Sequence, residues 1–358
     1  MAEVIGAGVT HFPGLALADK HLGDAFRWAL TDPDLPDELR DPAGWTSLVR
    51  QELGDDDGLE AATRHAEALR QGFRTVREAL DSFQPDLVVI WGDDQYELFR
   101  DELIPAFAVC VFDDMTANPW KGPIYAGRAN RFGEDEETTY KVLTHRPAAR
   151  HLVDSLLGKD VDVAYACEPQ EGRQLPAAWV NTLRYLDWDG GGFPYPSVFV
   201  SVNCHGSRLI KTKGAFARMS AFGPEGPPPD PPSPSPKRCF DVGAAIGETF
   251  ASSSWRVALV ASSSWSHSFL TEHTMFLRPD GDRDRMMYGL LEAGKLEEWK
   301  DIPLKEVERA GQHEMLNWFC LAGAVVRLGL TRRWSEFIES DLFASNKCFA
   351  IFDSPDEA

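Results

Sequence analysis

A histidine stands directly after the first apolar run of the chain, in the stretch HFPG at residues 11–14. The preceding run, VIGAGVT, is typical of a buried strand, so His11 is expected where that strand ends. A lone histidine there is usually part of an ordinary turn, but an imidazole is also a common metal ligand. Other polar groups that the fold brings to the same place decide between these interpretations.

Three further apolar runs are also followed at once by polar clusters. These clusters are WGDDQYE at 91–97, NCHGS at 203–207 and SSSWSH at 262–267. Ligands of open α/β sheets bind beyond the carboxyl ends of the strands, because loops there bring side chains from several elements together. Ordinary turn chemistry explains one such cluster, whereas four at carboxyl ends favour a functional site.

A fifth stretch, GQHEMLNWFCLAGA at 311–324, places Glu314 at the start of an amphipathic helix. Capping and the helix dipole favour a glutamate at that position, but its carboxylate can also point at a cation. His11, Glu314 and one further donor would form a 2-His-1-carboxylate set, or a variant of it. Such a set leaves open positions on Fe(II) for oxygen and substrate.

The elements that must position these residues alternate along the chain. This alternation predicts an α/β fold with a mixed, largely parallel central sheet, helices on both faces and a site at the carboxyl ends of the strands. Strands are predicted at 3–10, 86–92, 106–112, 161–166, 197–203 and 256–262, and helices near 59–82, 137–157, 240–252, 281–297 and 312–328.

The chain is interpreted as a single domain over residues 1–358. The stretch PEGPPPDPPSPSP at 224–236 can form neither a helix nor a central strand, and we expect it to be a surface loop. The segment 12–58 is rich in Asp, Pro and Trp, and is expected to fold over the edge of the sheet as a lid or wall.

The composition excludes several classes of partner. The chain has 358 residues, with 36 Lys and Arg against 56 Asp and Glu, for a formal charge of −20. Such a surface repels phosphate backbones and anionic lipid, so we expect neither nucleic acid nor membrane as a partner. No run approaches the length of a membrane span, and no signal peptide is recognised, so a cytoplasmic location is expected. The six scattered cysteines are expected to be reduced core residues.

Taken together, these motifs resemble the class III extradiol ring-cleaving dioxygenases, the superfamily typified by the catalytic subunit of protocatechuate 4,5-dioxygenase. The similar features are a His-x-Pro turn after the first strand, an acidic strand end at 91–97, a Ser-His pair after a later strand, and Glu314 opening a C-terminal helix. Their order covers nearly the whole chain. The resemblance implies a non-haem Fe(II) enzyme that cleaves a catechol-like ring with O2.

The resemblance also implies roles for individual residues. His11 matches the first iron ligand and Glu314 the carboxylate ligand. His267 matches the active-site histidine that such enzymes use as an acid and base. The family's second histidine ligand should end the strand at 86–92, but Gln95 stands at that place.

Three substitutes for this second ligand are open. Gln95 can bind through its amide oxygen, and Asp94 would be a harder, anionic ligand. His65 is the third, because a helix near 59–82 that runs antiparallel to the strand at 86–92 places it level with the end of that strand. Gln95 and His65 rank close together, with Asp94 behind them.

Further residues are candidates for binding the substrate, a small aromatic molecule. His205 and Arg208 can bind a carboxylate or a phenol, and Trp265 can stack on an aromatic ring, as can Trp91, Trp179 and Trp318 unless they pack in the core. A homo-oligomer is expected. Two other classes remain open, namely a metal-dependent enzyme with a different reaction, such as a non-catechol oxidation or a hydrolysis, and a metal-free binding protein.

Overall fold

A computed structural model describes residues 2–122, 124–213, 216–222 and 230–355 of the chain. Its centre is an eight-stranded sheet with the strand order β6-β3-β7-β2-β8-β1-β10-β9, and a separate two-stranded sheet pairs β4 with β5. The strands are β1 (Val4–Val9), β2 (Leu87–Asp93), β3 (Phe107–Cys110), β4 (Met115–Ala117), β5 (Tyr140–Val142), β6 (Ala164–Ala166), β7 (Ser197–Val202), β8 (Val257–Ser262), β9 (Thr331–Ile338) and β10 (Lys347–Asp353).

The four strands in the middle of the sheet, β7, β2, β8 and β1, are all parallel to their neighbours within this group. On the two flanks the direction changes, because β3 pairs antiparallel with β7 and β10 pairs antiparallel with β1. The mixed α/β sheet expected from the sequence is therefore confirmed. The polar clusters of the sequence follow these same four strands, so all four clusters reach the same edge of the sheet.

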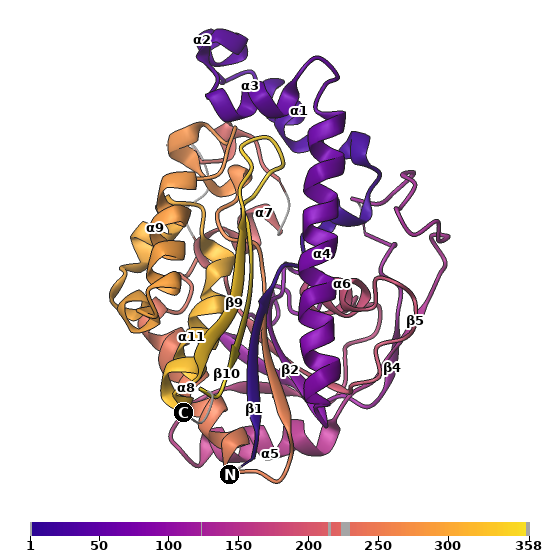
Figure 1. Ribbon diagram of the computed structural model, residues 1–358, viewed down its shortest axis with the longest axis vertical. Helices are drawn as coiled ribbons and strands as arrows, with labels where there is room; N and C mark the ends of the chain where they lie inside the picture. Colours follow the sequence, from indigo (N-terminus) through magenta and orange to yellow (C-terminus); the bar gives the residue numbers. More distant parts are fainter. Residues whose placement is uncertain (1, 123, 214–215, 223–229, 356–358) are drawn as a thin grey trace.

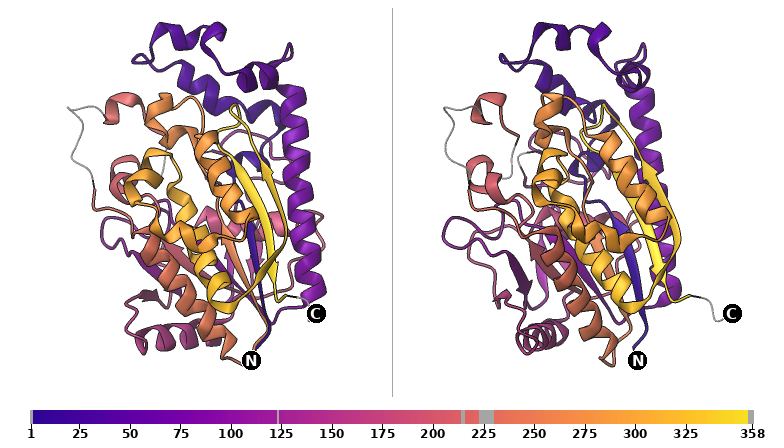
Figure 2. Two further views of the ribbon diagram at one scale, coloured as in Figure 1. Left: turned by 60° about the vertical axis from the view of Figure 1, so that its left-hand side comes forward. Right: turned by 90° about the vertical axis from the view of Figure 1, so that its left-hand side faces the viewer.

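Helices cover both faces of the sheet (Figure 1, Figure 2). Successive side chains of β2 alternate between two core clusters: Val88 and Ile90 pack on the side of α4 and α6, and Leu87 and Val89 on the side of α5, α8 and α11. Both faces of the strand are thus buried, as its continuous apolar run requires. The α-helices are α1 (Asp24–Leu30), α2 (Asp37–Arg40), α3 (Ser47–Leu53), α4 (Leu59–Phe83), α5 (Arg146–Leu157), α6 (Ala177–Leu186), α7 (Leu209–Thr212), α8 (Pro236–Ala251), α9 (Gly281–Glu292), α10 (Leu304–Arg309) and α11 (Leu316–Leu328).

The segment 12–58 forms short helices beyond the end of the sheet toward which β1 runs (Figure 1). Thr46 donates a hydrogen bond to Asp341, with 2.6 Å between Oγ1 and Oδ2, and Glu52 accepts from the backbone of Leu342 in the loop between β9 and β10. Apolar side chains of this segment, such as Phe26, join the core cluster on the α4 side. The predicted lid or wall is a packed part of the fold.

Several elements differ from the prediction. The helix expected near 137–157 begins only at Arg146, because residues 140–142 form β5. The helix expected near 281–297 ends at Glu292 and is followed by the 3-10 helix η8 (Leu296–Asp301). Strands β9 and β10 and helix α6 were not predicted. Of the proline-rich stretch 224–236, residues 224–229 lie outside the described part, and Pro236 already belongs to α8.

All six cysteines are free thiols, as expected. Five are buried, whereas Cys167 is exposed and so is not a core residue. Among the described residues, no helix combines the length and the apolar character that a membrane span requires.

Candidate metal centre

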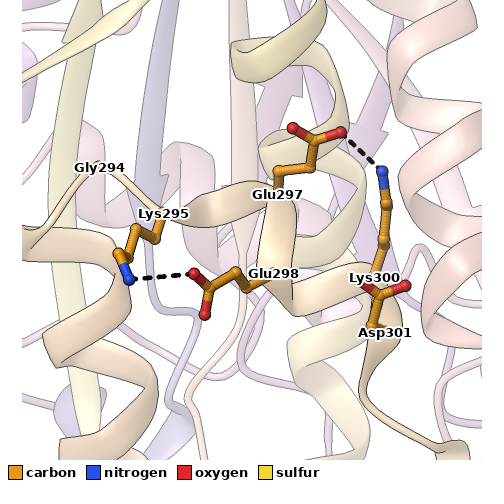
Figure 3. Close-up of a pocket in the computed structure, with 6 residues that line it drawn as sticks. All are labelled: Gly294, Lys295, Glu297, Glu298, Lys300 and Asp301. Carbon is orange, nitrogen blue, oxygen red and sulfur yellow. Dashed lines mark hydrogen bonds and ion pairs between the residues drawn. The ribbon is translucent and has the colours of Figure 1, made fainter.

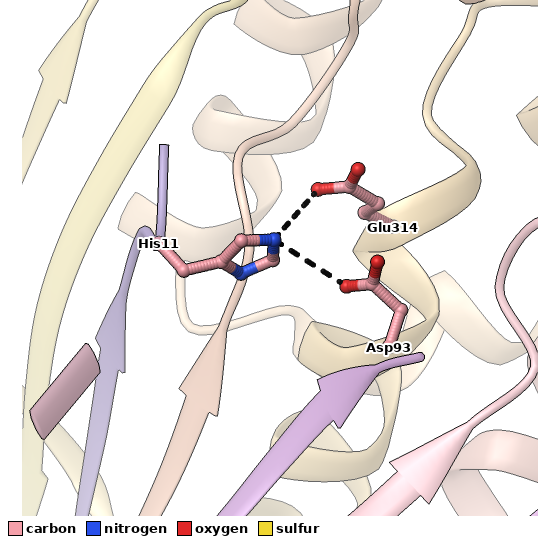
Figure 4. Close-up of side chains that lie close together, drawn as sticks. All are labelled: His11, Asp93 and Glu314. Carbon is pink, nitrogen blue, oxygen red and sulfur yellow. Dashed lines mark ion pairs between the residues drawn. The ribbon is translucent and has the colours of Figure 1, made fainter. Parts of the chain in front are cut away.

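One imidazole and two carboxylates meet at the edge where the parallel strands end. His11 lies just beyond β1, Asp93 is the last residue of β2, and Glu314 belongs to the 3-10 helix η9 (His313–Met315), which leads into α11. The Nε2 atom of His11 lies 3.6 Å from Oδ1 of Asp93 and 3.7 Å from Oε2 of Glu314 (Figure 4). All three side chains are buried. We call His11, Asp93 and Glu314 the central cluster.

Close packing of β1 against α11 brings together His11, from the start of the chain, and Glu314, from its last part. A Cβ atom on Gly8 would lie 2.0 Å from the ring of Trp318, so only glycine allows this approach. Trp318 in turn donates from Nε1 to the backbone oxygen of Ser263, at 3.2 Å. The strand that carries His11 and the helix that follows Glu314 are therefore held in direct contact.

The ring of His11 is oriented by its second nitrogen. Nδ1 lies 3.0 Å from the backbone oxygen of Ser262 at the end of β8 and donates to it, so the lone pair of the neutral ring is on Nε2, which faces the carboxylates. The backbone oxygen of His11 also accepts a hydrogen bond from Nδ2 of Asn181 on α6, at 3.2 Å. This arrangement is the one in which a histidine serves as a metal ligand.

Glu314 is held by its backbone as well as by its side chain. The preceding Gly311 has a φ of +67°, and a Cβ there would meet Oγ1 of Thr271 at 2.2 Å, so the turn requires glycine. The backbone oxygen of Glu314 accepts from Oγ of Ser263, at 2.8 Å. Burial raises the pKa of the Glu314 carboxyl, but the neighbouring His267, His205 and His11 outweigh burial and hold that pKa well below its ordinary value.

Amide donors fix the two carboxylates relative to each other. Nε2 of Gln95 donates to Oδ2 of Asp93, at 2.8 Å, and to Oε1 of Glu314, at 3.1 Å. Nδ2 of Asn317, on the first turn of α11, lies 3.3 Å from Oδ1 of Asp93. Because carboxylates only accept hydrogen bonds, the amide group of Gln95 faces them with its nitrogen.

His267 points at the central cluster from the loop after β8. Its Nδ1 lies 3.0 Å from the backbone oxygen of Trp265, and its Nε2 lies 3.2 Å from Oε2 of Glu314. The hydrogen bond at Nδ1 leaves Nε2 as the nitrogen that can take up and release a proton. The side chain is 7% exposed.

His205, from the loop after β7, reaches the same two carboxylates from another side. Its Nε2 lies 3.5 Å from Oδ2 of Asp93 and 3.5 Å from Oε1 of Glu314. Burial lowers the pKa of His205, but the two carboxylates outweigh burial and raise it to about 9. The ring of His313 stacks against that of His205 at a centroid distance of 6.3 Å, and burial lowers the pKa of His313 well below its ordinary value.

An acidic loop follows β2 directly behind the cluster. Asp94 accepts from the backbone nitrogens of Glu97 and Leu98, so its carboxylate closes this loop and does not face the central cluster. Burial raises the pKa of Asp94 to about 6. Burial, together with the charge of Asp94, raises the pKa of Glu97 to about 8.

Residues 231–349 match the family model of the catalytic LigB subunit of aromatic ring-opening dioxygenase. The resemblance to the class III extradiol dioxygenases is confirmed. The LigB-matched segment runs from the residues before α8 into β10, and it contains His267 and Glu314. His11, Asp93 and His205 lie outside it.

Relatives of the chain carry the name 2,3-dihydroxyphenylpropionate/2,3-dihydroxicinnamic acid 1,2-dioxygenase. The protein from Photorhabdus laumondii is 23% identical over 208 residues, which cover 58% of this chain and 50% of the relative. That from Paraburkholderia phymatum is 27% identical over 195 residues, covering 54% and 47%. That from Burkholderia vietnamiensis is 24% identical over 274 residues, covering 72% and 80%. The chain thus spans about half the length of the first two relatives.

The structure brings together His11, Gln95, Glu314, His267 and His205 of the residues singled out from the sequence. His65 lies elsewhere: its ring packs at 5.0 Å from that of Phe343, and burial, with the nearby Lys347, lowers its pKa well below the ordinary value.

Trp265 is fully buried among Trp299 and Trp318. The other three tryptophans, Trp91, Trp179 and Trp318, are also core residues. Arg208 pairs with Glu272, and burial lowers its pKa.

Sequence reasoning did not select Asp93 or His313. Asp93 was the first of three consecutive polar residues after an apolar run, and its position as the last residue of that strand was the available signal. His313 directly precedes Glu314, and its neighbourhood to a predicted ligand was the signal there. Both are fixed by local backbone geometry that a pattern of residue types does not contain.

A hollow of about 360 Å³ lies at the surface around the 3-10 helix η8, lined by Gly294, Lys295, Glu297, Glu298, Lys300 and Asp301 (Figure 3). Its charged groups pair with one another: Lys295 with Glu298 at 3.2 Å, and Lys300 with Glu297 at 2.7 Å. This hollow shares no residue with the central cluster.

Proposed function

We propose that the protein is a dioxygenase that opens an aromatic ring carrying two adjacent hydroxyl groups, with O2 as the second substrate and Fe(II) as its metal. The observation that carries the proposal is the central cluster, a buried imidazole within 3.7 Å of two carboxylates, at the edge of the sheet where the parallel strands end. The LigB match over residues 231–349 and the names of the relatives support the same activity.

The donor set fits a divalent ion. Donor atoms that share an ion at bond lengths near 2.1 Å lie about 3.0 Å apart at adjacent corners of an octahedron and about 3.4 Å apart at the corners of a tetrahedron. The distances from Nε2 of His11 to the two carboxylate oxygens, 3.6 and 3.7 Å, are a little longer than these values. Two buried carboxylates so close together also favour a positive charge between them. His11, Asp93 and Glu314 would hold the ion, with Asp93 in place of the histidine that the resemblance implies.

When bound, Fe(II) supplies a centre through which a diol and O2 exchange electrons. The residues around it prepare the substrate for that exchange. His267 takes a proton from a substrate hydroxyl at Nε2 and returns it to the product, because its Nδ1 is already committed to the oxygen of Trp265. Gln95 fixes the positions of the two carboxylates relative to each other through its amide hydrogen bonds.

The burial of the site serves the same chemistry. His11, Asp93, His205 and Glu314 are each no more than 3% exposed, and His267 is 6% exposed. A dry site strengthens the interactions between the carboxylates and a cation and keeps water from competing with the substrate. The helices of segment 12–58 pack beyond this edge of the sheet and contribute to its closure (Figure 1).

The test is to load the protein with Fe(II) without air and then to supply O2 with a panel of catechols, aminophenols and gallates. We expect oxygen uptake and yellow ring-opened products with at least one of the compounds. Neither is expected from His11→Ala or from the protein without metal. Tight binding of Fe(II) without oxygen uptake across the panel would overturn the proposed reaction.

A second candidate is a metal-dependent enzyme with another reaction, such as a hydrolysis. The observation that favours it is the donor set itself, because a cluster with two carboxylates and one histidine is harder than the set that the resemblance implies, and suits oxygen-preferring ions. Hydrolysis of ester or amide substrates in the presence of Zn²⁺ or Mn²⁺, without oxygen uptake, would identify this activity.

A further inference from the structure

We infer that His205 is a metal ligand of the central cluster and supplies the second imidazole that the end of β2 lacks. The inference rests on the proposed function of the cluster as a metal centre. It adds a donor from β7, a strand that carries no ligand in the set discussed so far.

The first observation is an unsatisfied buried atom. His205 is 1% exposed, and its Nε2 forms no hydrogen bond with any described residue. A buried polar atom without a partner is costly, by about 1 to 3 kcal/mol, and is rare unless something else satisfies it. Here the atom points at two carboxylates, at 3.5 Å from an oxygen of each, which is too far for a good hydrogen bond.

The second observation is the division of the carboxylate oxygens. His11 faces Oδ1 of Asp93 and Oε2 of Glu314, whereas His205 faces Oδ2 of Asp93 and Oε1 of Glu314. Each carboxylate therefore presents one oxygen to each imidazole. Both histidines turn Nε2 toward the same pair of carboxylates, and His205 does so on the side where Nε2 of Gln95 donates to them.

The third observation is the position of β7 in the sheet. β7 pairs with β2 in parallel, and Asp93 is opposite Val202, so the loops after these two strands start side by side. His205 comes three residues after Val202 and reaches the space beside the end of β2. A histidine missing from one strand end is thus replaced by a histidine from its neighbour. The metal centre would then contain two histidines and two carboxylates.

Co²⁺ binding tests the inference without the need for turnover. We would measure the affinity by calorimetry on the full-length wild type, His205→Ala and His205→Cys, after confirming by circular dichroism that each variant is folded. The control is His65, which is also buried with an Nε2 that has no hydrogen bond among the described residues, but which lies near Lys347. His65→Ala and His65→Cys are therefore matched variants of the same chemistry.

We expect His205→Ala to weaken Co²⁺ binding by about 10-fold to 100-fold or more, and His65→Ala to leave it unchanged. His205→Cys should show a thiolate-to-cobalt charge-transfer band in the near ultraviolet that is absent from the wild type and from His65→Cys. This band requires a bond between residue 205 and the metal, and a merely structural role would not produce it.

Three results have distinct meanings. If His205 only neutralises the carboxylates as a cation, His205→Ala removes a competing positive charge and binds Co²⁺ more tightly, which overturns the inference. Unchanged affinity in His205→Ala, with no new band in His205→Cys and with loss of binding in His11→Ala, also overturns it but leaves the proposed metal centre intact. Failure of the wild type to bind Co²⁺ or Fe²⁺ would overturn the proposed function itself.

Discussion

His65 and His205 lie in two regions that bury an imidazole to a similar degree but surround it with different groups. The side chain of His65 leaves helix α4 and meets Phe343 and the buried Lys347. That of His205 leaves the loop after β7 and meets Asp93 and Glu314. In the first region burial, together with Lys347, lowers the pKa of the imidazole, and in the second the carboxylates outweigh burial and raise it to about 9.

This difference separates a core histidine from a ligand. Burial alone disfavours the charged imidazole and, for the same reason, disfavours a metal ion. Two carboxylates reverse the sign of the local field and make the region attractive for any cation. The position of a histidine along its helix, which suggested His65, is therefore a weaker guide to metal binding than the charge of the side chains around its ring.

Removal of a carboxylate is the strongest test of whether the charge around His205 makes this region a metal site. Asp93→Ala leaves His205 beside a single carboxylate and takes a ligand from the central cluster. We expect Fe²⁺ affinity to fall by at least about 100-fold and ring-opening activity to disappear. Asp94→Asn is the matched control one residue along, and its affinity should stay within about 10-fold of the wild type. Equal losses in the two variants would show that Asp93 has no special role.

His267→Ala tests whether the site separates metal binding from proton transfer. His267 contacts Glu314 at 3.2 Å, but its Nε2 is assigned to the substrate proton and not to the metal. Turnover should fall by about 10²-fold to 10⁴-fold while the bound iron per chain is unchanged. Turnover and metal content must be measured together to distinguish proton transfer from metal binding. Loss of iron in proportion to the loss of activity would show that His267 is a ligand.

Six of the eight strands of the central sheet could be predicted, because each is a short apolar run, as burial on both faces requires. The strand at the β9 edge of the sheet was harder to predict. β9, with the sequence TRRWSEFI, is charged, and all its residues but the last are exposed or partly exposed, so they carry no buried-strand signal. Among the described strands it lies at the edge of the sheet, next to β10. Helix α6 was missed because its apolar face is short and follows a polar loop.

Within the site, His11 and Glu314 were found by residue type and position alone, and they lie together in the structure. The partner from β2 was not found, since Asp93, Asp94 and Gln95 are consecutive and their side chains point in different directions. A shift of one residue in the end of the strand changes which of them faces the cluster. Residue patterns do not locate a strand end that closely.

Gln95→Ala tests whether Gln95 only orients the two carboxylates near His205 or binds the metal itself. The amide nitrogen of Gln95 binds both carboxylates, so its loss frees Asp93 and Glu314 to move apart. We expect a decrease of about 10-fold in Fe²⁺ affinity, at the lower end of the effect of residues that orient ligands. Equilibrium dialysis with metal analysis measures it. A loss as large as that of Asp93→Ala would instead place the amide oxygen of Gln95 on the metal.

The smallest effect is expected on the His65 side, as a pH dependence of stability. The pKa of His65 lies well below its ordinary value in the folded protein, so the unfolded chain binds more protons as the pH falls below about 6.5. Stability contributed by the neutral ring is therefore complete above that pH and is lost below it, by at most about 1.4 kcal/mol per pH unit. His65→Gln cannot titrate, so the difference between its unfolding free energy and that of the wild type should be constant above about pH 7 and should shift in favour of the variant toward about pH 5. Urea unfolding of both proteins across this range measures the difference. Parallel curves would contradict the expectation, because they would mean that His65 takes up its proton in the folded state at the same pH as in the unfolded chain.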